Sequence, residues 1–136
     1  MQLAAAVGRP DPHAGEIPVA YVQLKPGASA TEAELMSFAT EQITERAALP
    51  KAIRVLSSMP LTGVGKIFKP ELKHREIGDA LRTAMHDAGV AAQRLEVLND
   101  PRWGTRVEVF VADSAAIRTA REVLGRFPFR FELSMA

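Results

Sequence analysis

The segment Ile17–Leu24, with the sequence IPVAYVQL, places the strongest constraint on how this chain can fold. Its residues are apolar and rich in β-formers almost without interruption, which is typical of a strand covered on both faces. Such a strand needs packing partners on each side. The turn sequence Lys25-Pro26-Gly27 ends the run. Together with the helix and strand patterns of the rest of the chain, this predicts an α+β fold in two layers: a small mixed sheet with helices packed on it, followed by a β-β-α-β extension.

Composition limits the classes of protein to which the chain can belong. Of its 136 residues, 47% are apolar, which is enough for a real core. The 17 basic and 16 acidic residues are interspersed and give a net charge of +1, which argues against an electrostatic nucleic-acid binder. The chain has no cysteine, so disulfides and thiolate metal sites are excluded.

Targeting signals are lacking in the sequence itself. No apolar run approaches the roughly 20 residues that a membrane span requires. The first ten residues, MQLAAAVGRP, lack the basic region of a signal peptide. Together with the lack of cysteine, this favours a reducing, cytoplasmic location.

The N-terminal half alternates strand and helix patterns. Leu3–Val7 is predicted to be a short buried strand, and its position at the very start suggests a chain cut from something longer. The following Gly8–Pro12 is turn-like, with two prolines. Thr31 and Glu34 form a capping box for a helix that should run to about Arg46. The apolar face of this helix is expected to consist of Leu35, Phe38, Ala39 and Ile43.

The C-terminal half continues with a strand at Ile53–Leu56, a glycine-containing loop and a second helix from Pro70. That helix carries an apolar stripe and ends at Gly89; the stripe is Ile77, Leu81 and Met85. A β-β-α-β tail follows, with strands at 94–98 and 106–111, a helix capped by Asp113 and a last strand with alternating apolar residues. These last residues are Phe127, Phe129, Phe131 and Leu133.

We expect the tail to pack as a small layer against this apolar stripe, because its four large apolar side chains need cover. From Ile53 onward the order β-α-β-β-α-β matches a ferredoxin-like arrangement. Alternatively, the strand at Ile53 belongs to the N-terminal sheet.

Candidate chemistry is concentrated in the loop Gly63-Val64-Gly65-Lys66. A Walker A motif would need glycine where Pro60 stands and a hydroxyl residue where Ile67 stands, so a P-loop is excluded. The three histidines, His13, His74 and His86, have no metal-ligand spacing, and we expect no metal site. Neither a Gly-x-Ser-x-Gly motif nor a cysteine nucleophile is present. Lys66 is the one candidate for catalysis that the residues offer.

Several segments in order resemble one family. They include Val7–Asp11, Gly15-Glu16, Lys25-Pro26-Gly27, Thr31-Glu32, Pro50-Lys51 and Pro60-x-Thr62-x-x-Gly65-Lys66-Ile67. From about Leu3 to Lys73 the chain is similar to the C-terminal domain of the AMP-forming acyl-CoA synthetases, the adenylate-forming superfamily of fatty-acid, acetate and aryl-acid ligases.

The resemblance implies a role for Lys66. In such enzymes a mobile C-terminal domain brings this lysine to the substrate carboxylate and the forming acyl-adenylate. Thr62, Gly63 and Gly65 would support the lysine. Lys69 and Arg46 are candidates for contact with CoA phosphates. ATP and CoA are the implied substrates, and Mg²⁺ would be bound with ATP. The resemblance places this site and the acid-binding pocket on a large N-terminal domain, which is not part of this sequence.

The resemblance also suggests a domain organisation. Residues 1–76 would form the lysine-loop domain and residues 77–136 a helix with a β-β-α-β extension packed on it. One departure is Leu61, where the family has a basic residue. The isolated chain is expected to be inactive. Two alternatives remain: a stand-alone accessory protein that supplies the lysine to a separate adenylating subunit, and an interaction module that self-associates through the extension.

Overall fold

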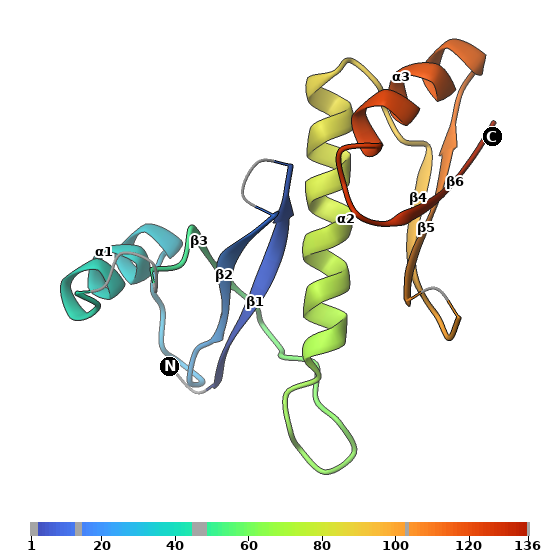
Figure 1. Ribbon diagram of the computed structural model, residues 1–136. Helices are drawn as coiled ribbons and strands as arrows, with labels where there is room; N and C mark the ends of the chain where they lie inside the picture. Colours follow the sequence, from blue (N-terminus) through green and yellow to red (C-terminus); the bar gives the residue numbers. More distant parts are fainter. Residues whose placement is uncertain (1–2, 13–14, 45–48, 103, 136) are drawn as a thin grey trace. The chain divides into compact units, whose positions relative to one another are not determined.

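The computed structural model describes residues 3–12, 15–44, 49–102 and 104–135. Its elements are β1 (Leu3–Asp11), β2 (Gly15–Gln23), α1 (Glu32–Gln42), β3 (Ala52–Val55), α2 (Lys69–Asp87), β4 (Arg94–Asp100), β5 (Gly104–Val111), α3 (Ser114–Leu124) and β6 (Arg130–Met135) (Figure 1). They form two compact units: of the described residues, the first holds 3–9 and 15–73, and the second holds 10–12 and 74–135. No helix of the described chain is long and apolar enough to cross a membrane. The α+β fold class is as predicted.

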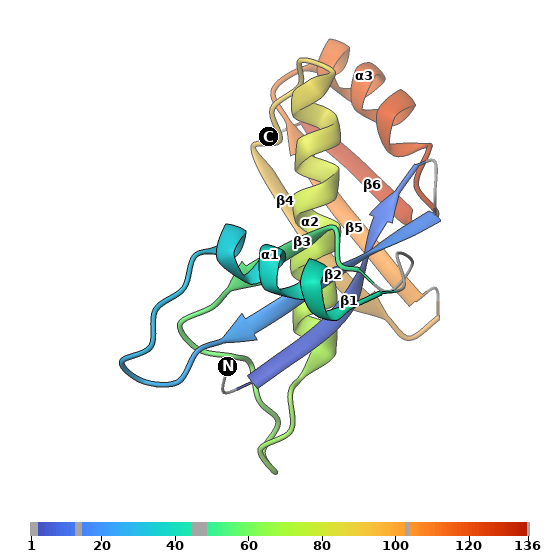
Figure 2. The same ribbon diagram turned by 90° about the vertical axis from the view of Figure 1, so that its left-hand side faces the viewer.

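The first unit is built on a three-stranded sheet with β2 at its centre. β2 and β3 run parallel, with Val19 opposite Ala52, and α1 connects them and lies against β3 (Figure 2). Val19 and Tyr21 are buried in the core of the unit, and Val22 is buried on the opposite face of the strand. The prediction that this strand is covered on both faces is confirmed.

The prediction of a turn at Gly8–Pro12 is wrong, because β1 continues to Asp11 and includes Pro10. β1 is an edge strand of its sheet. An edge strand tolerates proline, since one side of its backbone has no partner strand to which an N–H must donate. Ala5 and Val7 point into the core, while Ala4 and Ala6 are exposed.

Helix α1 begins as predicted but is shorter. The Thr31 hydroxyl accepts a hydrogen bond from the Glu34 amide at 3.1 Å, which is the Thr31 half of the predicted capping box. The helix ends at Gln42, with Ile43 already extended, so its predicted extension to Arg46 is wrong. The predicted apolar face is only partly buried, and Phe38 is 57% exposed. Arg46 and His13 lie outside the described residues.

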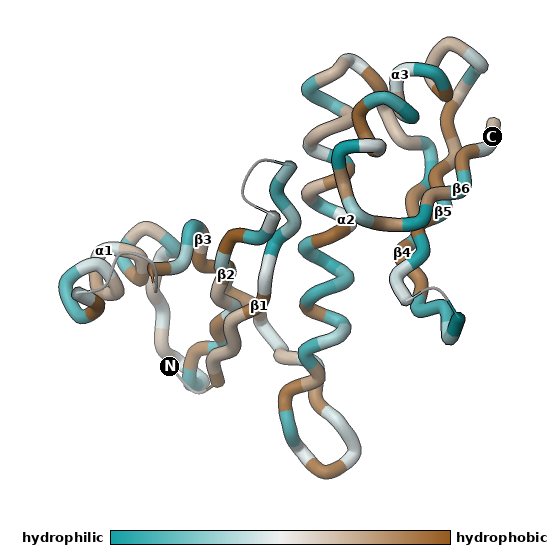
Figure 3. The backbone as a smooth tube through the Cα atoms, in the orientation of Figure 1, coloured by the Kyte–Doolittle hydropathy of each residue, from teal (hydrophilic) through white to brown (hydrophobic). Residues whose placement is uncertain are grey.

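The second unit has a single core between helices and sheet. Ile77, Leu81 and Met85 of α2 pack with Val107, Val109 and Val111 of β5, together with Ala120 and Leu124 of α3. Figure 3 shows the hydrophobic segments that recur along α2 between hydrophilic ones. Phe127 is buried in the same cluster, and Phe129, Phe131 and Leu133 are partly buried against it. The predicted packing of the tail on the α2 stripe is confirmed.

Helix α2 ends as its glycine predicts. Gly89 has a φ of +82°, the left-handed conformation that glycine adopts without steric cost. The Val90 amide donates to the Met85 carbonyl and the Gly89 amide to the His86 carbonyl, each at 2.9 Å. These two bonds are those of a Schellman motif, which satisfies the last carbonyls of the helix.

The ferredoxin-like topology is wrong, and the alternative is confirmed. β3 belongs to the first sheet, and the second sheet has the order β4-β5-β6. β4 and β5 are antiparallel, whereas β5 and β6 are parallel and are connected by α3. A parallel neighbour needs such a crossover connection. β6 also begins later than predicted, at Arg130, so Phe127 and Phe129 precede the strand.

Candidate active-site loop

Residues 59–68, here called the lysine loop, form a tight hairpin between β3 and α2 (Figure 1). Leu61 and Ile67 pair in an antiparallel bridge. Inside it the Thr62 amide donates to the Lys66 carbonyl at 2.7 Å, and the Gly65 amide to the Thr62 carbonyl at 2.9 Å. Gly65 has a φ of +83°. This is the geometry of a three-residue hairpin connection that ends in a glycine bulge.

The residues predicted to support Lys66 contribute unequally. The Thr62 hydroxyl accepts a hydrogen bond from the Lys66 amide at 3.2 Å and so fixes the backbone that carries the lysine. Gly65 adopts a backbone conformation that other residues enter only with strain. Gly63 has no positive φ, and a Cβ atom placed on it would meet nothing within 4 Å. That Gly63 allows a ligand to approach the loop closely stays a prediction.

Both ends of the lysine loop are anchored in the first unit. The Met59 side chain is 3% exposed and Ile67 packs against the same core cluster, which also holds Leu72 of α2. The Phe68 amide donates to the Pro60 carbonyl at 2.8 Å. The hairpin therefore projects from a fixed base instead of forming an irregular connection.

Gln23 is a supporting residue that the sequence did not reveal. Its side-chain oxygen, at the end of β2, accepts a hydrogen bond from the Met59 amide at 2.6 Å. This amide is part-buried, so the bond satisfies a donor that has limited access to water. A polar residue at the end of the buried run Ile17–Leu24 was the available signal, but its partner lies 36 residues away.

Gln23→Ala is expected to loosen the base of the lysine loop, because it removes the acceptor for the Met59 amide. Hydrogen exchange at Met59 and Phe68 should accelerate by about tenfold or more, since an unsatisfied buried donor costs about 1–3 kcal/mol. Gln23→Glu keeps an oxygen at this position and should stay near the natural rate. Equal exchange in all three proteins would exclude the anchoring role.

The tip of the lysine loop combines an exposed cation with exposed apolar side chains. Lys66 is exposed, and Leu61, Val64 and Phe68 are 50%, 82% and 45% exposed. Figure 3 shows hydrophobic segments in this loop. Large apolar groups that gather around a cation are typical of a surface that contacts another protein surface or a ligand.

Helix α2 begins immediately after the loop, at Lys69, which is exposed. Its first turn is a poor anion site by itself: Pro70 has no amide hydrogen, the Glu71 amide donates to the Phe68 carbonyl at 3.3 Å, and Glu71 adds a carboxylate. The structure therefore gives Lys69 an exposed position on α2. Arg46, the other residue predicted near CoA, lies outside the described part of the chain.

Comparison with known proteins matches the half of the chain that carries this loop. Residues 2–66 match the model of the AMP-binding enzyme C-terminal domain, and Lys66 is the last residue of the match. Marinolic acid–CoA ligase of Pseudoalteromonas sp. (strain SANK 73390) is 50% identical over 72 residues, which are 53% of this chain and 11% of that protein. Acetyl-coenzyme A synthetase of Deinococcus radiodurans is 39% identical over 79 residues, 58% of this chain and 12% of that protein.

Among solved structures, an acyl-CoA synthetase of Brucella canis is 35% identical, with a TM-score of 0.48, over 55% of this chain and 14% of that one. The chain thus spans between a tenth and a seventh of the length of these relatives. The family match and the relatives identify residues 2–66 as an AMP-binding enzyme C-terminal domain, the domain found in AMP-forming CoA ligases.

Proposed function

We propose that this chain is the C-terminal part of an AMP-forming acyl-CoA ligase and that Lys66 acts in its first half-reaction. In that step a carboxylate oxygen attacks the α-phosphorus of ATP, pyrophosphate leaves, and an acyl-adenylate forms. In the second step the CoA sulfur attacks the acyl carbon, and AMP leaves with the electron pair of the broken bond. The observation that carries the proposal is the placement of Lys66 at the exposed tip of an anchored hairpin, at the end of the matched domain.

Electrostatics explains why a lysine on such a hairpin suits this step. Negative charge is redistributed between the carboxylate and the α-phosphate as the new bond forms. A cation fixed beside these oxygens in a closed, water-poor cleft stabilises them far more than the same cation does in bulk water. The bonds that Thr62 and Gly65 make hold the Lys66 backbone in place before the substrate arrives.

The proposal divides the active site between two domains. ATP, Mg²⁺ and the acid would be held by a large N-terminal domain, and the lysine loop would reach into that site. The exposed apolar side chains of Leu61, Val64 and Phe68 fit a surface that becomes covered when the domains close. Lys69 and Arg46 are the residues proposed to contact CoA phosphates in the second step.

Val64→Asp tests the proposed closure. Val64 is 82% exposed, so the substitution should change the stability of the isolated chain by no more than about 0.5 kcal/mol. In the complete ligase it should lower the rate of adenylation by about tenfold to a hundredfold, because burying a valine contributes roughly 1.5–3 kcal/mol. Val64→Ile, which keeps the apolar surface, is the control. An unchanged adenylation rate in Val64→Asp would mean that this side chain stays in solvent throughout.

The isolated chain is expected to bind ATP no better than millimolar. The lysine loop is exposed, and in the first turn of α2 Pro70 has no amide hydrogen and the Glu71 amide already donates to Phe68, which weakens the turn as a phosphate site. Calorimetry of the chain with MgATP measures this affinity. Micromolar binding would contradict the division of the site and would indicate an independent nucleotide-binding domain.

A further inference from the structure

The open edge of β6 in the second unit has a self-complementary sequence. β6 pairs with β5 on one side, and none of the described strands lies on its other side. An open edge leaves backbone N–H and C=O groups available for pairing with another strand.

An apolar hollow lies beside this edge. Phe131 and Leu133 of β6 line it together with Arg121, Leu124 and Gly125 from α3 and its end, and its volume is about 250 Å³. Phe131 and Leu133 belong to the core face of the sheet but are only partly buried. A strand added at this edge would place its own apolar side chains next to them.

The core face of the opposite edge strand, β4, lies against α2. A Cβ atom placed on Gly78 of α2 would lie 3.7 Å from the Val97 side chain and 3.8 Å from that of Leu95. These are ordinary van der Waals distances, so α2 covers these two side chains of β4.

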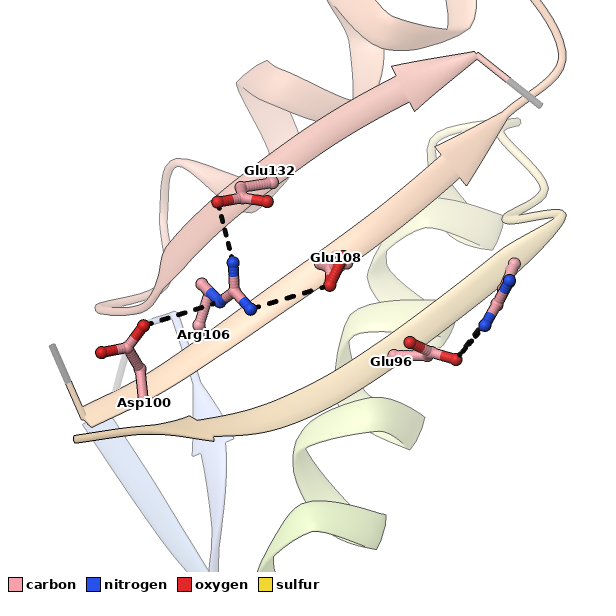
Figure 4. Close-up of polar contacts among 6 residues, drawn as sticks. Glu96, Asp100, Arg106, Glu108 and Glu132 are labelled. Carbon is pink, nitrogen blue, oxygen red and sulfur yellow. Dashed lines mark hydrogen bonds and ion pairs between the residues drawn. The ribbon is translucent and has the colours of Figure 1, made fainter. Parts of the chain in front are cut away.

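The charges of β6 are arranged on the outer face of the sheet. Figure 4 shows Glu132 and Arg106 on the side opposite the helices, and the Arg106 guanidinium donates to Glu132 at 3.0 Å. Asp100 and Glu108 lie 3.8 and 3.9 Å from the same guanidinium. The hydrogen bond to Glu132, followed by its charge, raises the pKa of Arg106. The outer face of this sheet therefore carries charges of both signs that pair with one another, and not charges of a single sign.

Within β6, Arg130 and Glu132 stand symmetrically on either side of Phe131. If two β6 strands run antiparallel with Phe131 opposite Phe131, each Arg130 faces a Glu132 of the other copy. Phe129, which immediately precedes β6 and packs against the core, then comes to lie opposite Leu133. Opposite charges and apolar pairs directly across antiparallel strands are stabilising, and like charges are destabilising. An isologous dimer repeats each favourable pair twice.

We propose that two copies of this chain associate through antiparallel pairing of their β6 strands about Phe131. The two second units would then share one six-stranded sheet, and each copy would cover the apolar hollow of the other. The proposal does not depend on the ligase function of the lysine loop. A partner of a different sequence would not need the symmetric order Arg130-Phe131-Glu132.

The first test is the molar mass of the full chain in solution, measured by light scattering over a range of concentrations. The natural chain should dimerise. Arg130→Glu and Glu132→Arg should each raise the dimer dissociation constant by about tenfold or more, because like charges then face each other twice. An equimolar mixture of the two variants should dimerise again. Arg94 of β4, whose side chain is 65% exposed, provides the control. Arg94→Glu makes the same change of charge as Arg130→Glu but at the other edge of the sheet, and it should leave the dimer intact.

The second test measures proximity and does not depend on charge reversal. The chain has no cysteine, so a disulfide can form only between introduced residues. Arg130→Cys and Glu132→Cys, mixed and oxidised, should yield a linked dimer faster than either variant alone, because directly opposite residues have Cα atoms about 4.5–5.5 Å apart. Three results would overturn the proposal. The natural chain could be a monomer, the dimer could dissociate in Arg94→Glu but not in the β6 variants, or the mixed disulfide could form no faster than the others.

Discussion

Lys66→Ala in the complete ligase is expected to lower the rate of acyl-adenylate formation by about 10²–10³-fold, the usual cost of removing one group that stabilises developing charge. The Lys66 side chain is exposed, and the hydrogen bonds that Lys66 makes within the hairpin come from its backbone, so the fold of the chain should not change. Steady-state kinetics of the acid-dependent release of pyrophosphate measures the effect.

Lys73→Ala is the matched control for this substitution. Lys73 is an exposed lysine on α2, and its replacement removes the same charge from the same unit of the chain. The rate should stay close to that of the natural enzyme. A similar loss in both variants would point to a general electrostatic effect instead of a specific contact at Lys66.

Leu81→Ala is expected to destabilise the second unit by about 2–5 kcal/mol. Leu81 is completely buried, and its cluster joins α2, β5 and α3, so the surrounding side chains have little freedom to fill the cavity. For a unit of this size, the midpoint of thermal unfolding should fall by at least about 10 °C. Circular dichroism during heating, or urea titration, measures the change.

Leu81→Met nearly conserves the side-chain volume and should cost less than about 1.5 kcal/mol. If Leu81→Ala left the unfolding transition in place, the packing of the C-terminal tail on the α2 stripe would be incorrect.

Local sequence signals predicted the parts of the fold that local physics controls. The stripe at Ile77, Leu81 and Met85, the Gly89 cap and the Asp113 cap all recur in the structure, since each depends on residues within one or two helical turns. The cover on both faces of Ile17–Leu24 follows from its nearly continuous apolar character.

The parts that the sequence did not predict depend on distant partners. β1 continues through Pro10, and its position at the edge of the sheet is one where proline is tolerated. The sequence does not decide to which sheet β3 belongs, because strand order alone allows pairing with β2 and pairing within the tail; in the structure β3 pairs with β2. Phe38 fits the periodicity of α1 but stays exposed, since periodicity gives a face and not the element that covers it.

The candidate site divides in the same way. The residues Thr62, Gly65 and Lys66 are close in sequence, and the hairpin they form is local. The anchor at Gln23 is not local, and its contact with Met59 arises only when β2 and the lysine loop come together. The boundary between residues 76 and 77 remains a prediction from the resemblance.

The most direct test of the central claim separates the two half-reactions in the Lys66→Ala ligase. Adenylation is measured by acid-dependent exchange of labelled pyrophosphate into ATP, and thioester formation by conversion of supplied acyl-adenylate and CoA. The account predicts that the exchange falls by about 10²–10³-fold while thioester formation stays near the natural rate. Equal losses in both half-reactions, or an unchanged exchange, would contradict the assignment of Lys66 to adenylation.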